Sequence, residues 1–257
     1  MLFDACCFTG KWPFRKLGRP EISQMLEDHG RNGVTGGIVS SLESVFYNDP
    51  NEGDEDVAWR LPAGYLFAAT HNPMLPYAAK EISENAYNAA AVRLFPCYHM
   101  YKPDDPRVAE CCRAAASAGL VVYVIARMDD MRFDYILHQQ VTDIASIAVL
   151  ARTVPEARFV VSYGLELYNK IHLFADLPNV YIDGAYMPDL VFGYRDVAPG
   201  IPPGRLLFGT HHPLQLMESN VVTLRLADME TGEKDCVMYK NAAELFGLPV
   251  ALSSSRA

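Results

Sequence analysis

Three side chains that can take up or donate a proton lie at the ends of short apolar runs, or just after them. They are Asp183, Tyr163 and His211. An ionised carboxylate or a neutral imidazole can activate water as a general base, and a phenol can donate a hydrogen bond to a developing oxyanion. We therefore interpret these three residues as the catalytic candidates of a hydrolytic reaction.

Other cationic or hydrogen-bonding side chains near the same run ends could hold an anionic substrate. Arginine binds a carboxylate through two parallel hydrogen bonds, and a buried arginine needs a partner because an unpaired buried charge is costly. Arg93 could therefore pair with an internal acid such as Asp4 or Asp183 instead of a ligand, and for His99 and His71 we favour a structural role. The substrate-binding candidates are Arg15, Arg93, His99, Arg127, His212 and His71.

The elements that must position these residues are short apolar runs that alternate with longer helical stretches. This alternation is typical of a parallel sheet built from strand–helix units, and uninterrupted apolar runs fit strands covered on both faces. The predicted strands are Leu2–Cys7, Gly33–Ser40, Gly64–Thr70, Ala90–Phe95, Leu120–Ala126, Ala157–Ser162, Val180–Asp183 and Arg205–Gly209. Eight such strands close a barrel, so we predict an α/β fold with a single (β/α)8 TIM barrel, whose chemistry lies at the carboxyl ends of the strands.

Helical spacing follows most of these strands. The predicted helices are Glu21–His29, Pro76–Asn88, Pro106–Ala118, Asp134–Thr153, Leu165–Asp176, Leu214–Leu226 and Asp235–Phe246. His29, His138 and His172 lie in these helices, and we assign them structural roles. The stretch 198–204 is too rich in proline and glycine for a helix and should be a loop. The 257 residues match the length of one barrel, so we expect one domain over 1–257 with a closing helix at about 235–246.

The composition argues against several classes of protein. The net charge is −9, with 31 acidic and 22 basic residues, which argues against a nucleic-acid surface. No apolar stretch approaches the roughly 20 residues that span a bilayer, and the first residues lack the features of a secretory signal. The 6 cysteines include two vicinal pairs, which do not suggest a disulfide framework. We therefore expect reduced thiols in a cytoplasmic protein.

Several separate segments, by their order and spacing, are specific for one known fold family. They are Gly10-Lys11-Trp12-Pro13-Phe14-Arg15, His71-Asn72-Pro73, Val92-Arg93-Leu94-Phe95-Pro96, Leu207-Phe208-Gly209-Thr210-His211-His212-Pro213 and the closing segment 241–248. Together they resemble the amidohydrolase-related family (amidohydrolase 2 type) of metal-dependent TIM-barrel hydrolases, the branch that includes decarboxylases and lactonases. The resemblance implies a small-molecule substrate and, because members are often dimers, a homodimer is one expectation.

The resemblance also implies where a metal ion would be bound. Members of the family carry two histidines in the first strand, and here Cys6 and Phe8 stand in their places. Ile125 and Tyr163 take the places of histidines in the fifth and sixth strands, and His211 takes that of an aspartate after the eighth. A catalytic zinc site needs about three protein ligands. We therefore expect no metal cofactor; the alternative is a single divalent ion with Cys6 and His211 as weak candidate ligands.

Two functions from different classes remain open. The first is hydrolysis of a small carboxylate-bearing ester or lactone without the usual metal site, with arginines holding the carboxylate and His211 or Asp183 activating water. A pairing of Cys6 with His211 across the barrel is a further arrangement of this kind. The second is a non-catalytic barrel that binds a small molecule or another subunit. The loss of the family's ligands favours it, as does the lack of a Gly-x-Ser-x-Gly elbow or a Gly-rich phosphate loop.

Overall fold

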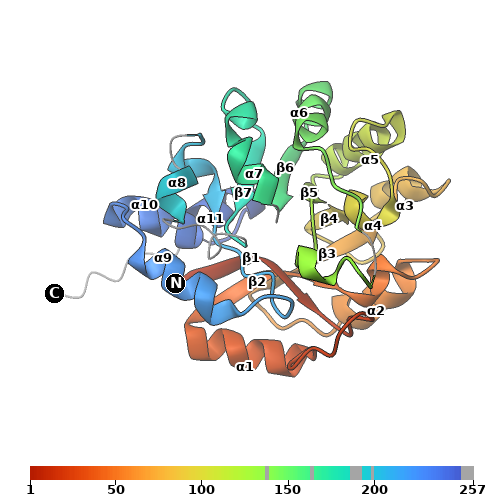
Figure 1. The fold of residues 1–257 in the computed structure, drawn as a ribbon. Helices are drawn as coiled ribbons and strands as arrows, with labels where there is room; N and C mark the ends of the chain where they lie inside the picture. Colours follow the sequence, from red (N-terminus) through yellow and green to blue (C-terminus); the bar gives the residue numbers. More distant parts are fainter. Residues whose placement is uncertain (137–138, 163–164, 186–192, 198–199, 250–257) are drawn as a thin grey trace.

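A closed ring of parallel strands surrounded by helices forms the molecule in the computed structural model (Figure 1). The structure describes residues 1–136, 139–162, 165–185, 193–197 and 200–249. The strands are β1 Leu2–Thr9, β2 Val34–Ser41, β3 Tyr65–His71, β4 Ala91–Leu94, β5 Val121–Ile125, β6 Arg158–Ser162, β7 Val180–Asp183 and β8 Leu206–Leu207. They pair in chain order, each parallel to the next.

The barrel closes through backbone hydrogen bonds between β1 and the segment that follows β8. The amide of Ala5 donates to the carbonyl of Phe208 over 2.8 Å, and the amide of Phe8 donates to the carbonyl of His212 over 2.7 Å. This arrangement confirms the predicted (β/α)8 TIM barrel. Because all eight strands run the same way, their carboxyl ends meet at one end of the barrel, where side chains from distant parts of the sequence converge.

The helices are shorter and more numerous than the sequence pattern predicts. They are α1 Ile22–Asn32, α2 Asn51–Ala58, α3 Ala78–Glu84, α4 Pro96–His99, α5 Pro106–Ser117, α6 Ile144–Thr153, α7 Leu165–Asn169, α8 Tyr194–Val197, α9 Met217–Leu226, α10 Thr231–Asp235 and α11 Asn241–Phe246. Short 3₁₀ helices cover Glu43–Val45, Met131–Phe133, Ile171–Phe174 and Pro203–Arg205, and a π-helical turn, Cys236–Lys240, joins α10 to α11. The predicted closing helix is therefore continuous but irregular.

The predicted helix 134–153 is wrong over residues 134–136 and 139–143, while residues 137–138, and with them His138, lie outside the described part of the chain. The structure begins α6 at Ile144, because Asp143 caps it by accepting a hydrogen bond from the amide of Ala145. The preceding Gln139 accepts hydrogen bonds from the amides of Met128 and Asp129, which ties this segment to the loop after β5. Tertiary hydrogen bonds thus replace the helical ones that the apolar spacing suggested.

Helix α1 packs against the outer face of the first strands. Its first turn is held by a capping box between Glu21 and Gln24, and Gly33 ends it in the left-handed conformation, with φ of 77°. Met25 and His29 on its inner face are buried. The helix therefore presents an imidazole to β1 from outside the barrel.

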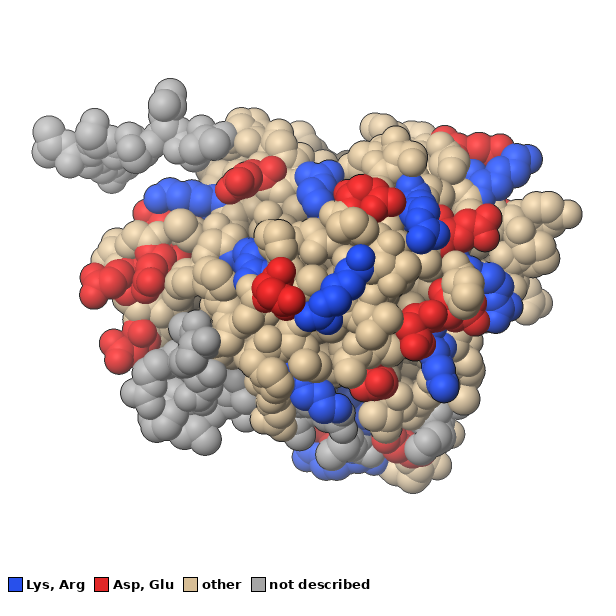
Figure 2. All heavy atoms as spheres, turned by 90° about the horizontal axis from the view of Figure 1, so that it is seen from above, with Lys and Arg blue, Asp and Glu red and all other residues tan. Residues whose placement is uncertain are grey.

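The surface carries charges of both signs. On the face shown in Figure 2, acidic and basic side chains alternate without forming a continuous basic stripe. Among the described helices, none is long and apolar enough to cross a membrane.

Candidate functional site

Four side chains from different strand ends meet inside the barrel. Cys6 lies on β1, Ser162 ends β6, Asp183 ends β7 and His211 follows β8. The sulfur of Cys6 lies 3.2 Å from the hydroxyl oxygen of Ser162 and 3.6 Å from Nδ1 of His211. The Ser162 hydroxyl also acts on the Asp183 carboxyl group and lowers its pKa. These residues form one polar chain across the lumen, which we call the lumen cluster.

The environment of His211 fixes its protonation. Its Nε2 atom lies 3.0 Å from the carbonyl oxygen of Met128, which can only accept a hydrogen bond, so Nε2 carries the ring proton. Nδ1 is then an acceptor that faces the thiol of Cys6. Burial lowers the pKa of His211 to about 3, so the ring is neutral at pH 7. The residue has a φ of 56°, a conformation uncommon outside glycine.

Asp183 has one satisfied and one unsatisfied carboxylate oxygen. Oδ1 accepts a hydrogen bond from the amide of Ala185 over 3.0 Å. Oδ2 is buried and accepts no hydrogen bond of normal geometry from the described residues. Desolvation by burial raises the pKa of Asp183 to about 6, which is close to the value that suits a general base near neutral pH.

A fixed cation lies beside this cluster. The fully buried guanidinium of Arg93 donates hydrogen bonds of 2.9 Å to the carbonyl oxygens of Cys7 and Ile38. It also lies over the rings of Phe8 and Tyr123, 4.3 and 5.1 Å from their centroids. The partners of Arg93 are thus carbonyls and aromatic faces, where the sequence suggested an internal carboxylate; its charge nevertheless lowers the pKa of Asp183.

The other two arginine candidates belong to one network at the barrel mouth. Arg15 forms an ion pair with Asp129, with Nε 3.1 Å from Oδ2, and Trp12 donates to the same oxygen. Arg127 pairs with Asp134 over 2.8 Å and donates to the carbonyl of Asp129. Both guanidinium groups already have carboxylate partners, and substrate binding by them stays a prediction.

The remaining histidine candidates lie apart from the lumen cluster. His99 places Nε2 2.8 Å from the carbonyl of Val45, and His71 lies 3.9 Å from the carboxylate of Glu81. Burial lowers the pKa of His71 to about 4. His212 faces α1, and Tyr163 lies outside the described residues. The structure therefore brings together His211 and Asp183 of the predicted set, with Ser162 and the Met128 carbonyl as partners that the sequence reasoning missed.

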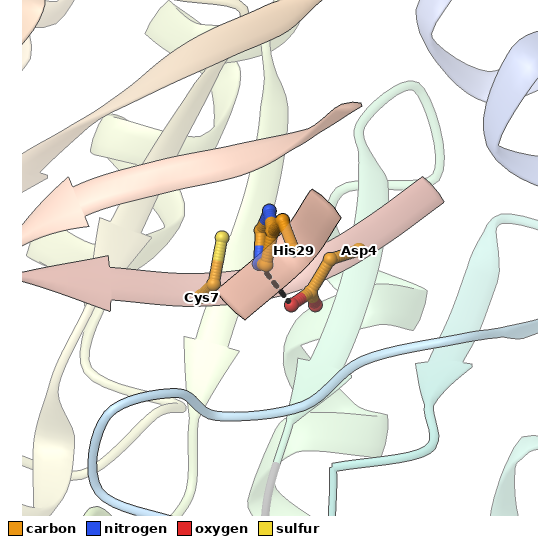
Figure 3. Close-up of side chains that lie close together, drawn as sticks. All are labelled: Asp4, Cys7 and His29. Carbon is orange, nitrogen blue, oxygen red and sulfur yellow. Dashed lines mark ion pairs between the residues drawn. The ribbon is translucent and has the colours of Figure 1, made fainter. Parts of the chain in front are cut away.

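A second cluster lies on the other side of β1. Asp4, Cys7 and His29 place one potential ligand atom each within 4.8 Å of one another, and all three residues are buried. Figure 3 shows Asp4 and Cys7 of β1 and His29 of α1 pointing toward one another. Residues three apart in a regular strand face opposite sides, but the register of β1 with β2 shifts between Asp4 and Cys7. This irregularity brings both side chains to His29.

The three residues have well-defined partners behind them. The carboxylate of Asp4 accepts hydrogen bonds from the amides of Cys6 and Thr210 and from the Thr210 hydroxyl. Nδ1 of His29 lies 2.8 Å from the hydroxyl of Tyr65. Its Nε2 lies 3.3 Å from Oδ2 of Asp4, yet makes no hydrogen bond of normal geometry. Burial raises the pKa of the Cys7 thiol well above its usual value.

The positions at which the family binds its ion do not form a matched ligand set here. Cys6 and His211 offer a sulfur and a nitrogen close together. Phe8 and Ile125 have no ligand atom, and Phe8 packs its ring edge-to-face against His211 with centroids 5.0 Å apart. By contrast, a carboxylate, a thiol and an imidazole are the ligand types that zinc takes in proteins, and the Asp4–Cys7–His29 cluster supplies one of each.

Solved structures with this architecture are distant in sequence. A 5-carboxyvanillate decarboxylase from Sphingomonas paucimobilis has 16% identity and a TM-score of 0.73, with 96% of this chain and 99% of that chain covered. The enzyme of the same name from Novosphingobium aromaticivorans, complexed with manganese and 4-hydroxy-3-methoxy-5-nitrobenzoic acid, has 13% identity, a TM-score of 0.71 and coverage of 90% and 82%. A proposed 2-pyrone-4,6-dicarboxylic acid hydrolase from Pseudomonas putida has 12% identity, a TM-score of 0.69 and coverage of 97% and 98%.

These findings correct the expectation that the protein has no metal cofactor. A solved protein of this fold contains manganese, and the chain itself brings three metal-ligand types together at Asp4, Cys7 and His29. The sequence reasoning failed because it tested only the strand ends inside the barrel and assigned His29 a structural role. The candidate ligand set lies one layer outward, where a strand irregularity and a helix meet.

The family is established by the sequence itself. The sequence profile described as Amidohydrolase matches residues 57–248, which is most of the chain. No match to this sequence was found among the curated proteins. The chain belongs to the amidohydrolase family.

Proposed function

We propose that the protein hydrolyses a small carboxylate-bearing ester or lactone at the lumen cluster. The observation that carries this proposal is the convergence of Asp183, Ser162, Cys6 and His211 at the ends of four strands. Carboxyl ends of barrel strands are where enzymes of this fold place their chemistry. A buried carboxylate of raised pKa and a neutral imidazole in one cluster are groups that can deprotonate and position water.

The proposed steps conserve protons throughout. Oδ2 of Asp183 takes a proton from water while Nδ1 of His211 accepts a hydrogen bond that orients it. The oxygen of that water bonds to the ester carbonyl carbon, and the carbonyl oxygen becomes an oxyanion. The carbon–oxygen bond to the alcohol then breaks, and Asp183 returns its proton to the leaving alkoxide. Tyr163, which follows Ser162 in the sequence, stays our candidate for the oxyanion donor.

The substrate class is proposed from charge and from the solved neighbours. Arg15 and Arg127 give the barrel mouth positive charge, although Asp129 and Asp134 must release them before they bind a carboxylate. The neighbours described above include a complex with a nitrobenzoic acid and a proposed hydrolase of a pyrone dicarboxylic acid. A ring that bears a carboxylate is therefore the chemistry we assign to the ligand.

A metal ion would be held outside the lumen cluster. Asp4, Cys7 and His29 are the residues that would hold it, since they alone among the described residues form a group of three ligand types. When bound near a substrate, a divalent ion polarises carbonyl groups and lowers the pKa of water. The roles given to Asp183 and His211 concern proton transfer and water orientation on the lumen side of β1.

A second candidate function is a barrel that binds a small anion without turning it over. The specific observation in its favour is burial: the side chains of Cys6, Ser162, Asp183 and His211 are all 0% exposed. A cluster of this kind also serves as a hydrogen-bonded core that specifies the packing of the lumen. This candidate predicts ligand binding with no chemistry.

One set of measurements distinguishes the hydrolase from the binding barrel. The protein is assayed against carboxylate-bearing lactones, esters and pyrones, and its thermal unfolding is followed with benzoate and pyrone carboxylates. Turnover that is lost in His211→Ala and retained in His172→Ala supports hydrolysis; His172 is an exposed histidine and serves as the matched control. Thermal stabilisation by a carboxylate without turnover of any compound would instead support the binding barrel and overturn the hydrolytic proposal.

A further inference from the structure

We propose that Asp4, Cys7 and His29 form a zinc-type metal site in the wall between β1 and α1, outside the barrel lumen. This site differs in position from the one that the family resemblance implied, which lies inside the lumen at Cys6 and His211. The proposal does not depend on the hydrolytic function, because the ion is assigned to the opposite side of β1. Its role is to fasten α1 to β1.

The spacing of the ligand atoms suits a small ion. With metal–ligand bonds of about 2.0–2.3 Å, the ligand atoms around a tetrahedral zinc ion lie roughly 3–4 Å apart. Nε2 of His29 and Oδ2 of Asp4 are separated by 3.3 Å, and the Cys7 sulfur lies within 4.8 Å of both. Small side-chain rotations therefore suffice to bring all three atoms to one ion.

The Nε2 atom of His29 supports the proposal that an ion binds beside it. His29 is fully buried, yet its Nε2 makes no hydrogen bond of normal geometry with any described residue, although buried polar groups in native proteins nearly always have a partner. Its other ring nitrogen lies 2.8 Å from the Tyr65 hydroxyl, the kind of outer contact that orients metal-binding histidines. Asp4 is held in the same way by Thr210. Both side chains are thus held in place by neighbours, although Oδ2 of Asp4, the oxygen nearest to His29, also accepts a hydrogen bond from the Thr210 hydroxyl.

The close approach of the β2 backbone to the Asp4–Cys7–His29 cluster supports the same metal site. Gly37 of β2 lies next to the cluster, where a Cβ atom would come within 2.8 Å of the Asp4 carbonyl oxygen and 3.3 Å of the Cys7 sulfur. A larger residue there would push Asp4 and Cys7 apart. Glycine at this position lets the irregular part of β1 and its two ligands pack together.

A route for the ion leads in from the surface beside α1. A cavity of about 350 Å³ is lined by His212, Asp28 and Glu218, among other residues. The ring of His212 lies 6.2 Å from that of His29, and its Nε2 accepts or donates no hydrogen bond among the described residues. His212 therefore borders both the cavity and the cluster. Arginines that pair with Asp28 also line the cavity, so the route is proposed from the position of His212 and not from charge.

The ligand chemistry selects the kind of ion. Thiolate and imidazole ligands favour zinc or cobalt, whereas manganese prefers oxygen-rich sites. The proposed site therefore takes Zn²⁺ or Co²⁺ in preference to the manganese that a solved neighbour contains.

The test uses the full chain, stripped with a chelator and then titrated with Zn²⁺ or Co²⁺. We expect one ion per chain, a rise in melting temperature with Zn²⁺, and a thiolate-to-cobalt charge-transfer band with Co²⁺. Cys7→Ser should remove the band, and Tyr65→Phe should weaken binding by about 10–100-fold through loss of the outer hydrogen bond. Cys6→Ser is the matched control, because the adjacent sulfur faces the lumen, and it should keep the band.

Several outcomes overturn the proposal. They are failure of the folded wild-type chain to retain either ion, a band that survives in Cys7→Ser, and a band that disappears in Cys6→Ser. Anomalous scattering from zinc-soaked wild-type crystals decides the matter without any variant. A peak among Asp4, Cys7 and His29 supports the site, whereas a peak beside Cys6 and His211, or no peak, refutes it.

Discussion

The sulfur of Cys6 and Nδ1 of His211 lie 3.6 Å apart inside the barrel. His211 is held from its other side by the Met128 carbonyl, and Cys6 continues through Ser162 to Asp183. Cys6 and His211 stand at positions where the family resemblance implied metal ligands. Here they form part of a hydrogen-bonded chain. Burial raises the pKa of Asp183, at the far end of that chain, to about 6, above the value of about 3 for His211, and the first prediction concerns Asp183.

Asp183→Asn should lower kcat by about 10²–10⁴-fold, the usual contribution of a general base, because an amide cannot take a proton from water. Folding should be retained, since asparagine keeps an oxygen for the Ala185 amide. Steady-state kinetics on the substrate identified from the panel measures the effect. Asp176→Asn, at an exposed residue paired with Arg152, is the control and should leave kcat unchanged. Equal rates for Asp183→Asn and wild type would exclude Asp183 as the base.

The rate of hydrolysis should rise with pH through about 6. Burial raises the pKa of Asp183 to about 6, and the base acts only when ionised, so the active form grows as pH increases through that value. His211, with a pKa near 3, stays neutral throughout this range and contributes no step there. A pH profile of kcat measures the transition. A profile that falls with pH over this range would contradict the assignment.

Asp54 should make the folded state less stable as pH rises from about 4 to about 7. Burial raises the pKa of Asp54 to about 7 although the Ser44 hydroxyl and the Thr70 amide donate to it. A raised carboxyl pKa contributes stability that is complete below the unfolded value near 4 and is lost as pH passes the folded value. By linkage the loss is about 4 kcal/mol.

The prediction for Asp54 is checked by comparing the free energy of unfolding of two proteins. Urea unfolding is followed across this pH range for the wild type and for Asp54→Asn, which cannot titrate. The free-energy difference between them should change with pH as described. His71, whose pKa is lowered to about 4, contributes with the opposite sign in both proteins, so it cancels in the difference. A pH-independent difference would show that Asp54 does not titrate in this range.

Gly37→Ala should destabilise the protein by about 1–3 kcal/mol, the usual cost of overpacking, because its Cβ would meet the backbone oxygen of Asp4. Gly30→Ala, in α1, is the matched control. A Cβ at Gly30 meets no atom within 4 Å, so alanine should stabilise the helix by about 0.5–1 kcal/mol. Chemical unfolding of both variants at one pH compares them. The reverse order of stabilities is incompatible with close packing at Gly37.

The sequence predicted the barrel because its parallel strands are buried on both faces and appear as continuous apolar runs. It missed α2, whose residues 51–58 are mostly polar and acidic, so little apolar spacing marks a helix. It named His211 and Asp183 as candidates; in the structure Asp183 ends β7, His211 follows β8, and their catalytic roles stay predictions. It could not find the Asp4–Cys7–His29 cluster, since regular alternation places residues 4 and 7 on opposite faces and only the register shift in β1 reverses this.

The two neighbouring cysteines of β1 have different surroundings because of that register shift. Cys6 faces Ser162 and His211, whereas the Cys7 thiol donates to the Ile38 carbonyl in the layer beneath α1. A slip of β1 by one residue would exchange which sulfur reaches the interior and which reaches the helix. The pairing of this single strand therefore decides how the two thiols are distributed between the inner and outer layers, and mutations that alter strand alignment would disturb both clusters at once.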